Sequence, residues 1–107
     1  MITVQLNGVL RRAMVDSGCS QTIILQTLAR GRNQVVDVMA IDGRLVRSGG
    51  ESICDITIRR STIKVRCLLL PQLVSDIEVI LGLDVIMKLG GMTIDVHGVR
   101  FGCEMAA

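Results

Sequence analysis

Three turn-forming residue pairs, each ending in glycine, divide this chain into short segments. Asn7-Gly8, Asp42-Gly43 and His97-Gly98 each stand between two segments in which polar and apolar residues alternate. Asn-Gly and Asp-Gly suit the type I′ turns of two-residue β-hairpins, because both turn positions take a positive φ. An alternation with a period of two gives each strand one face for the core and one for solvent. The pattern therefore predicts an all-β domain of short antiparallel strands.

The expected strands are the segments in which this alternation, or a short apolar run, is clearest: residues 3–6, 9–15, 35–41, 44–47, 53–58, 63–70, 79–81, 92–96 and 99–101. A short helical turn is expected within residues 22–29. One short helix is expected over residues 84–89, because Asp84 can cap its start, Lys88 can pair with Asp84 as its i+4 partner, and Gly90-Gly91 ends it.

The central hairpin makes a specific prediction of strand register. With its turn at residues 59–62, Cys54 lies directly opposite Cys67 and Asp55 lies opposite Arg66. One face of the hairpin is then apolar and the other polar, as a half-exposed antiparallel sheet requires. Oxidation could link the two cysteines where the geometry permits it.

Metal and cofactor sites have little support in the sequence. The four cysteines contain no C-x-x-C pair, and His97 is the only histidine. A structural zinc site needs several closely spaced cysteine and histidine ligands. We therefore expect reduced thiols, no bound metal and no cofactor.

The composition narrows the class of protein. The length of 107 residues predicts a single domain spanning residues 1–107. Half of the residues are apolar, which allows a small core. Phe101 is the only aromatic residue, so the core must be aliphatic. The net charge of +2 comes without a basic block, which argues against a nucleic-acid partner. The sequence shows neither a signal peptide nor an apolar run of about 18 residues, so we expect no membrane association and a cytoplasmic location.

Elimination leaves carboxylate chemistry. A serine or cysteine nucleophile usually needs a base, and His97 beside a glycine is better explained as a turn residue. The glycine-rich phosphate-binding motifs and the G-x-S-x-G motif are absent. Most acidic residues have local roles, but Asp16 follows the apolar run Ala13-Met14-Val15 at what should be a buried strand end. A carboxylate there is costly unless it is hydrogen-bonded or shares a proton.

Three segments resemble one known family. AMVDSGCS, AIDGRLV and VILGLDVIMKLGGMTIDV are similar to the active-site, flap and helix segments of retropepsins, the aspartic proteases of retroviruses and of Ty3/Gypsy-type LTR retrotransposons. The resemblance runs from about Val4 to Gly102. It implies a closed β-barrel or sandwich with one short C-terminal helix, one lobe per chain, and an aspartic endopeptidase that processes a retroelement polyprotein, in the cytoplasm or within virus-like particles.

The sequence departs from the family pattern in three places. Cys19 stands where alanine is commoner, and the hairpin at Asp42-Gly43 has fewer glycines than many family flaps. Only 15 residues precede Asp16, fewer than in many retroviral enzymes, whose N-terminal strand helps to join two subunits. The subunit interface is therefore expected in the segment from Val99 to Ala107 and in the active-site turns.

Catalysis by this chemistry needs two carboxylates, one to take a proton from water and one to donate a proton to the oxyanion. The chain has one Asp-Ser-Gly, so the second acid must be Asp16 of another copy, which predicts a C2 homodimer. The resemblance implies that Ser17 bonds across the two-fold axis and that Gly18 offers its backbone to substrate. Ser17 could equally stabilise its own turn.

Substrate is expected to bind as an extended strand, with apolar residues beside the cleaved bond. Residues 39–45 would form a flap that closes over it. Ile80 and Leu81 would line side-chain pockets or support the Asp16 loop, and both are core residues under either interpretation. The residues expected to contact substrate are Met14, Ser20, Met39, Ala40, Ile41, Asp42, Gly43, Ile80 and Leu81.

Two other functions stay open at the level of sequence. A non-catalytic or domesticated retropepsin-like module, acting in dimerisation or peptide binding, would have nearly the same sequence. The third hypothesis is a small β-barrel that binds nucleic acid. A salt titration that shows no affinity for nucleic acid at low salt would exclude it.

Overall fold

The computed structural model describes residues 1–29, 37–39, 45–47 and 50–102. Its elements in chain order are β1 (Ile2–Leu6), β2 (Val9–Val15), β3 (Ile23–Leu25), the 3-10 helix η1 (Gln26–Leu28), β4 (Asp37–Met39), β5 (Leu45–Arg47), β6 (Gly50–Ile58), β7 (Ser61–Leu70), β8 (Val79–Leu81), α1 (Leu83–Lys88), β9 (Met92–Asp95) and β10 (Gly98–Phe101). The short helical turn expected within residues 22–29 is η1.

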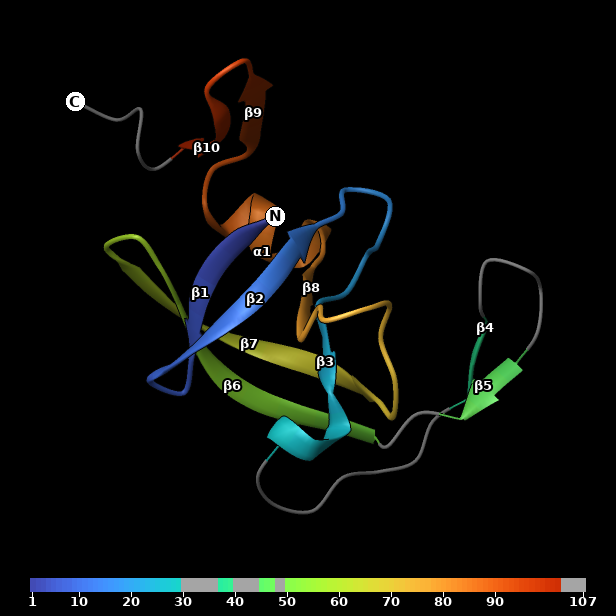
Figure 1. The fold of residues 1–107 in the computed structure, drawn as a ribbon. Coiled ribbons are helices and arrows are strands. Elements are labelled where there is room, and N and C mark those ends of the chain that lie inside the picture. The colour runs from blue at the N-terminus through green and yellow to red at the C-terminus, as the bar shows by residue number, and fades with distance from the viewer. Residues whose placement is uncertain (30–36, 40–44, 48–49, 103–107) are drawn as a thin grey trace.

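Six strands close into a barrel in the order β1-β2-β8-β3-β7-β6 (Figure 1). This confirms the predicted all-β class and the closed barrel with one short α-helix in the described part of the chain. The pairs β2–β8 and β3–β7 are parallel, whereas the other neighbours in the barrel are antiparallel. Hairpin turns predict only antiparallel neighbours, so the sequence did not indicate the two parallel pairs.

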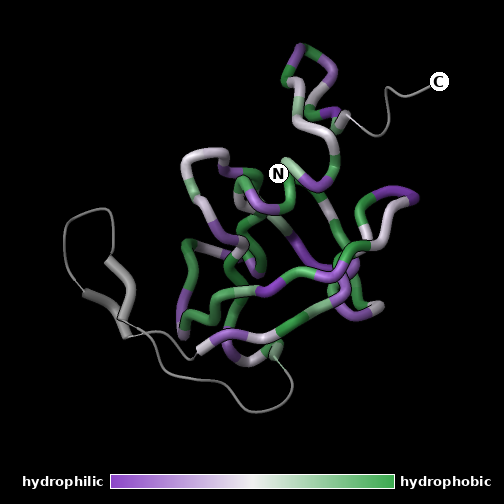
Figure 2. The backbone as a smooth tube through the Cα atoms, turned by 180° about the vertical axis from the view of Figure 1, so that it is seen from behind, coloured by the Kyte–Doolittle hydropathy of each residue, from purple (hydrophilic) through white to green (hydrophobic). Residues whose placement is uncertain are grey.

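The barrel encloses an aliphatic core, as the composition predicted. Along β1, Val4 and Leu6 are buried whereas Thr3 and Gln5 are exposed, which is the expected alternation. Figure 2 shows the same interleaving of hydrophobic and hydrophilic stretches along the backbone. The buried residues of the main cluster are Val4, Leu6, Ala13, Ile24, Cys54, Ile56, Ile58, Val65, Cys67, Leu69, Val79, Leu81, Val85, Ile86, Leu89 and Phe101.

The register predicted for the central hairpin is wrong by two residues. The turn between β6 and β7 comprises residues 59–60 instead of residues 59–62, so Cys54 is opposite Val65 and not Cys67. Both thiols are free and buried. Cysteines on diagonal positions of a sheet are farther apart than directly opposed ones, which makes the anticipated disulfide less favourable.

The charged pairing on the outer face of this hairpin changes with the register. Lys64, and not the predicted Arg66, is opposite Asp55, and its Nζ lies 3.1 Å from the carboxylate Oδ1. The assignment of the two faces is correct, because a shift of two residues keeps every side chain on its side of the sheet. The short turn is possible because Arg59 takes a φ of 55°. Asn, Asp and Gly are the usual residues there, so nothing in the sequence indicated it.

Helix α1 begins one residue earlier than predicted, and two of its expected contacts are replaced. Gly82 is the N-cap, so Asp84 lies within the first turn and does not cap the helix. Lys88 donates its Nζ to the carbonyl of Lys64 at 2.9 Å, so the predicted pairing of Lys88 with Asp84 is wrong. The expected end of the helix is confirmed, since Gly90 and Gly91 both have a positive φ.

Antiparallel strand pairs are present on either side of the three predicted turns, as β1–β2, β4–β5 and β9–β10. The predicted Asp42-Gly43 turn lies outside the described residues. The first turn has the expected type I′ signature, with φ of 50° at Asn7 and 86° at Gly8. The last turn is formed by residues 96–97, one position before the predicted pair, because Gly98 already pairs with Asp95. Within the described ranges, no helix is long and apolar enough to cross a membrane.

The two faces of β6 provide a test of the core. Ile56 is fully buried, whereas Ile53 on the same strand is 63% exposed. We expect Ile56→Ala to lower the free energy of unfolding by about 2–5 kcal/mol, because it leaves a cavity in the barrel. Ile53→Ala is the matched control and should change it by less than about 0.5 kcal/mol. Urea denaturation of both variants measures the difference, and equal losses would contradict the assignment of the faces.

Candidate active site

The Asp-Ser-Gly segment forms a turn at one end of the barrel. It follows β2, which pairs in parallel with β8 so that Met14 is opposite Ile80 and Val15 is opposite Leu81. Figure 1 shows the loop from β2 to β3 at the same end of the barrel as α1. The apolar residues before Asp16 therefore anchor the turn in the barrel, while the turn itself lies at the rim.

Asp16 holds its turn with both its backbone and its side chain. Its amide donates to the carbonyl of Leu81 at 3.0 Å, and its carbonyl accepts from the amide of Cys19 at 3.2 Å. The carboxylate Oδ1 accepts from the amide of Gly18 at 2.9 Å. The predicted turn chemistry is thus present. Asp16 is half-buried in the single chain. The expectation of a buried strand end is therefore wrong, because β2 ends at the solvent-facing rim of the barrel.

Gly18 has a steric reason to be glycine. A Cβ at this position would lie 3.2 Å from Asp16 Oδ1, which is closer than most real contacts of a β-carbon. Without a side chain, its amide can approach the carboxylate and orient it. Ser17, Gly18 and Ser20 are all exposed, so the turn presents its polar groups outward, beside the acid.

A buried threonine connects this loop to helix α1. Thr22 is fully buried, and its amide and hydroxyl donate to Asp84 Oδ2 and Oδ1 at 3.1 and 2.7 Å. The hydroxyl also accepts from the amide of Gly82 at 3.1 Å. The amide of Val85 supplies a third donor to Asp84, at 2.8 Å. The Asp84 carboxylate therefore serves the structure of the loop rather than the chemistry.

The start of α1 also bonds directly to the Asp16 loop. The amide of Leu83 donates to the carbonyl of Cys19 at 2.6 Å, and the amide of Asp84 donates to that of Ser20 at 3.3 Å. A Cβ on Gly82 would lie 2.7 Å from the same Cys19 carbonyl, so only glycine permits this approach. The loop is therefore held on one side by β8 and on the other by α1.

Cys19, the unusual residue of the motif, is not a nucleophile in this setting. Its thiol donates to the carbonyl of Gln21 at 3.0 Å. Burial raises the pKa of the Cys19 thiol, the hydrogen bond to Gln21 opposes this shift, and the nearby carboxylates of Asp16 and Asp84 raise the pKa further. A thiol that stays protonated cannot attack a carbonyl efficiently. Among the described residues, no group of three or more His, Cys, Asp or Glu side chains could hold a metal ion.

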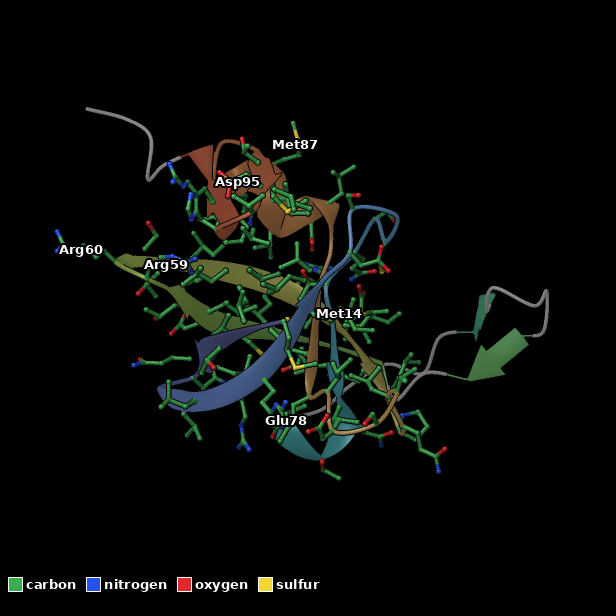
Figure 3. The ribbon with its side chains drawn as sticks, turned by 45° about the horizontal axis from the view of Figure 1, so that its top comes forward. Met14, Arg59, Arg60, Glu78, Met87 and Asp95 are labelled. Carbon is green, nitrogen blue, oxygen red and sulfur yellow. The ribbon has the colours of Figure 1, made fainter. Side chains whose placement is uncertain are left out.

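Of the residues expected to contact substrate, two adjoin each other. Met14 on β2, which is labelled in Figure 3, is opposite Ile80 on β8, and both residues are half-buried. Their neighbours Ala13 and Leu81 are fully buried, so Met14 and Ile80 share the face that points away from the core. The expectation that Ile80 is a core residue is therefore wrong, because alternate residues of β8 point to opposite faces. Leu81 lies in the core, and its carbonyl bond to Asp16 fits the supporting role that the sequence left open.

The flap residues are described only in part. Met39 ends β4 and pairs with Leu45 on β5, which supports the expected hairpin. Ala40, Ile41, Asp42 and Gly43 lie outside the described residues. The sequence reasoning missed Thr22 and the true role of Asp84. In the sequence, Thr22 is marked only by its place six positions after Asp16, and Asp84 only by its place two positions after Gly82. Each of these residues has an ordinary local explanation.

Comparison with known proteins shows the fold. No protein-family model and no curated protein sequence matches the chain. Among solved structures, it is similar to EIAV protease complexed with the inhibitor HBY-793, with 18% identity over 88% of this chain and 90% of that chain and a TM-score of 0.69. It is also similar to the retroviral protease-like domain of Ddi1 from Leishmania major, with 18% identity, 94% and 86% coverage, and a TM-score of 0.65.

A bacterial structure gives the same result. A retropepsin-like aspartic protease from Rickettsia conorii matches with 17% identity over 92% of this chain and 76% of that chain, at a TM-score of 0.64. At such low identity the likeness concerns the backbone arrangement. The chain has the retropepsin fold, which confirms the resemblance that the three motifs indicated.

The bond between Thr22 and Asp84 can be tested by removing one hydroxyl. We expect Thr22→Val to lower the free energy of unfolding by about 1–3 kcal/mol, because the amide of Gly82 loses a buried acceptor and Asp84 loses a donor. Thr57→Val is the matched control, since Thr57 forms an exposed bond to Thr62 Oγ1 at 2.8 Å. Its effect should stay within about 0.5 kcal/mol. Thermal unfolding compares the two, and a control as damaging as Thr22→Val would contradict the assigned role.

Proposed function

We propose that this chain is an aspartic endopeptidase that acts as a homodimer, with a water molecule activated between two Asp16 carboxylates. The observation that carries the proposal is the position of Asp16. Its half-exposed carboxylate lies in an Asp-Ser-Gly turn at the rim of a barrel with the retropepsin fold. The Gly18 amide orients one oxygen of the Asp16 carboxylate. Because the turn is exposed, a second copy of the chain can approach the carboxylate from the solvent side.

The need for a second copy follows from the chemistry of the reaction. One carboxylate takes a proton from water as the water oxygen attacks the scissile carbonyl, and its protonated partner donates to the developing oxyanion. Two carboxylates within hydrogen-bonding distance cannot both be ionised, so the pair shares one proton, as is usual for aspartic-protease dyads. A C2 dimer provides that pair from one residue type.

Asp84 is bonded to the Asp16 loop, but it is unsuited to complete the pair within one chain. Its two oxygens accept three hydrogen bonds, from the amide and hydroxyl of Thr22 and from the amide of Val85. A carboxylate engaged in this way cannot turn toward a substrate without breaking the link between the loop and α1. One lobe therefore supplies one catalytic acid.

The substrate we propose is an extended peptide with apolar residues at the cleaved bond. Met14 and Ile80 supply an apolar surface on the two strands that lead to the Asp16 turn and to Gly82. The β4–β5 hairpin would cover the peptide and exclude water. The motif resemblance to proteases of LTR retrotransposons supports a retroelement polyprotein as the natural substrate.

Replacing the proposed catalytic acid tests the function. We expect Asp16→Asn to lower the rate of cleavage of apolar peptides at about pH 4–6 by roughly a thousandfold or more, because the amide cannot act as a base. Asp55→Asn is the matched control, since that carboxylate forms a surface pair with Lys64 and should leave cleavage unchanged. If the unmodified chain forms a folded dimer but cleaves no peptide, the result would instead favour a non-catalytic peptide-binding module.

Mixing the subunits tests the need for two acids. An excess of the Asp16→Asn chain should suppress the activity of the unmodified chain, because mixed dimers contain one carboxylate where two are needed. Activity that stays in proportion to the unmodified chain would show that each chain works alone. That outcome would contradict the shared site.

A further inference from the structure

Strand β6 is longer than the strand that pairs with one of its edges. Strand β1 ends at Leu6, so it pairs with β6 only at Ile56 and Thr57. The Asn7-Gly8 turn then leads the chain away from β6 into β2 (Figure 1). The N-terminal half of β6 therefore continues past this turn without β1 beside it.

The turn makes the last contacts of β1 and β2 along this edge. The amide of Asn7 donates to the carbonyl of Asp55 at 2.8 Å, and Asn7 Oδ1 accepts from the amide of Asp55 at 2.9 Å. Both backbone groups of Asp55 therefore point toward the β1 side. Residues two apart in a strand direct their backbone groups to the same edge. The amide and carbonyl of Ile53 consequently point to the same side, where β1 has already ended.

Strand β7, on the other edge, does not pair with these two groups. Ile53 is opposite Arg66, but the Arg66 carbonyl points away from β6 and accepts from Gln21 Nε2 at 3.2 Å. The two residues therefore form a non-hydrogen-bonded pair of the antiparallel ladder. No turn, loop or side chain in the described part of the chain bonds to the Ile53 backbone either. Ile53 thus presents one free donor and one free acceptor.

A cavity of about 470 Å³ lies over this edge. Its lining residues are Asn7, Gly8, Ser52, Ile53, Asp55, Thr57 and Thr62. Cavities of this size are within the range of ligand sites in proteins. The side chain of Ile53 is 63% exposed and supplies an apolar contact within an otherwise polar lining.

The polar side chains of the lining are largely engaged with one another. The hydroxyls of Thr57 and Thr62 lie 2.8 Å apart, and Asp55 Oδ1 pairs with Lys64 Nζ at 3.1 Å. The Ile53 backbone therefore supplies a free donor and acceptor pair among groups that already have partners. A donor and an acceptor on one residue of a strand edge match the backbone of an extended peptide.

We propose that the edge of β6 at Ile53 binds an extended segment of another polypeptide, which adds to the barrel as a strand beside the Asn7-Gly8 turn. One residue of the peptide exchanges both backbone hydrogen bonds with Ile53. The side chain of that residue is apolar and β-branched, because it lies against the exposed side chain of Ile53 on the same face of the sheet.

This site is separate from the candidate active site. The Asn7-Gly8 turn precedes the first residue of β2, whereas Asp16 follows the last, and the seven residues of β2 span about 20 Å. A peptide bound at Ile53 leaves the Asp16 turn free. The inference does not rest on the proposed function, because a catalytic and a non-catalytic chain would both carry this edge.

Amide hydrogen exchange, followed by NMR, tests whether the edge is open. We expect the amide of Ile53 to exchange about a hundredfold or more faster than the amide of Cys54, which points to β7 and pairs with Val65. Equal protection of the two amides would overturn the proposal, because the edge would then already be occupied.

An NMR titration with a defined probe tests binding. The probe is the peptide Thr-Val-Thr-Val-Thr, flanked by one lysine at each end for solubility, acetylated and amidated, at pH 7. We expect saturable shift changes at the amides of Asn7, Gly8 and Ile53. The same peptide with both valines N-methylated is the matched control and should cause no change, because it cannot donate to the Ile53 carbonyl.

Replacing Ile53 tests the backbone pairing directly. We expect Ile53→Pro to raise the dissociation constant of the probe about fivefold or more beyond the effect of Ile53→Ala, because proline removes the free donor. Proline is tolerated at a strand edge whose amide faces solvent, so the ladder with β7 should persist. Equal affinities of the two variants would contradict the pairing.

A second variant keeps the test decisive if the proline chain does not fold. Thr62→Arg places a bulky cation in the cavity and should weaken probe binding about fivefold or more, because it fills space and repels the lysines of the probe. Thr3→Arg is the matched control, since Thr3 is exposed on β1 outside the cavity lining, and it should leave binding unchanged. Equal binding by the two arginine variants would overturn the site.

Failure of this inference differs from failure of the proposed function. Shift changes confined to Met14 and Ile80 would overturn the second site while supporting peptide binding beside Asp16. Shift changes at Ile53 in a chain that cleaves no peptide would support the second site and contradict the catalytic proposal. A probe that causes no shift change at any concentration would overturn the second site.

Discussion

The parallel pairing of β2 with β8 is the constraint on which the candidate site depends. Parallel neighbours run in the same direction, so the segments that leave them emerge at the same end of the barrel. At that end of the barrel, Asp16 follows the last residue of β2 and Gly82 follows the last residue of β8. The bond from the Asp16 amide to the Leu81 carbonyl, and the bonds from α1 to Cys19 and Ser20, all follow from this arrangement.

The two aspartates that follow the paired strands have different roles. Asp16 lies in the turn after β2, and Asp84 lies in the first turn of α1 after β8. Asp84 accepts three hydrogen bonds and joins the loop to the helix. Asp16 keeps a half-exposed carboxylate that a single amide orients. A lobe built in this way holds its loop rigidly but offers one acid, and the proposed dimer supplies the second.

Local signals accounted for the hairpins, the short helix and the Asp16 turn. They failed where a contact joins segments distant in the sequence. Thr22 and Asp84 are 62 residues apart, and each has an ordinary local role that conceals the bond between them. The register of β6 and β7 was missed for a different and local reason, since Arg59 adopts a positive φ that its residue type does not suggest.

The sequence by itself determined the period-two alternation, the approximate place of each turn and the carboxylate that follows Val15. These depend on backbone preferences and side-chain patterns that act within a few residues. The tertiary structure alone decided the parallel pairs, the role of Asp84, the burial of Leu81 and the open edge of β6 at Ile53. Those features follow from closing six strands around one core, and burial of the whole apolar set decides which distant strands become neighbours.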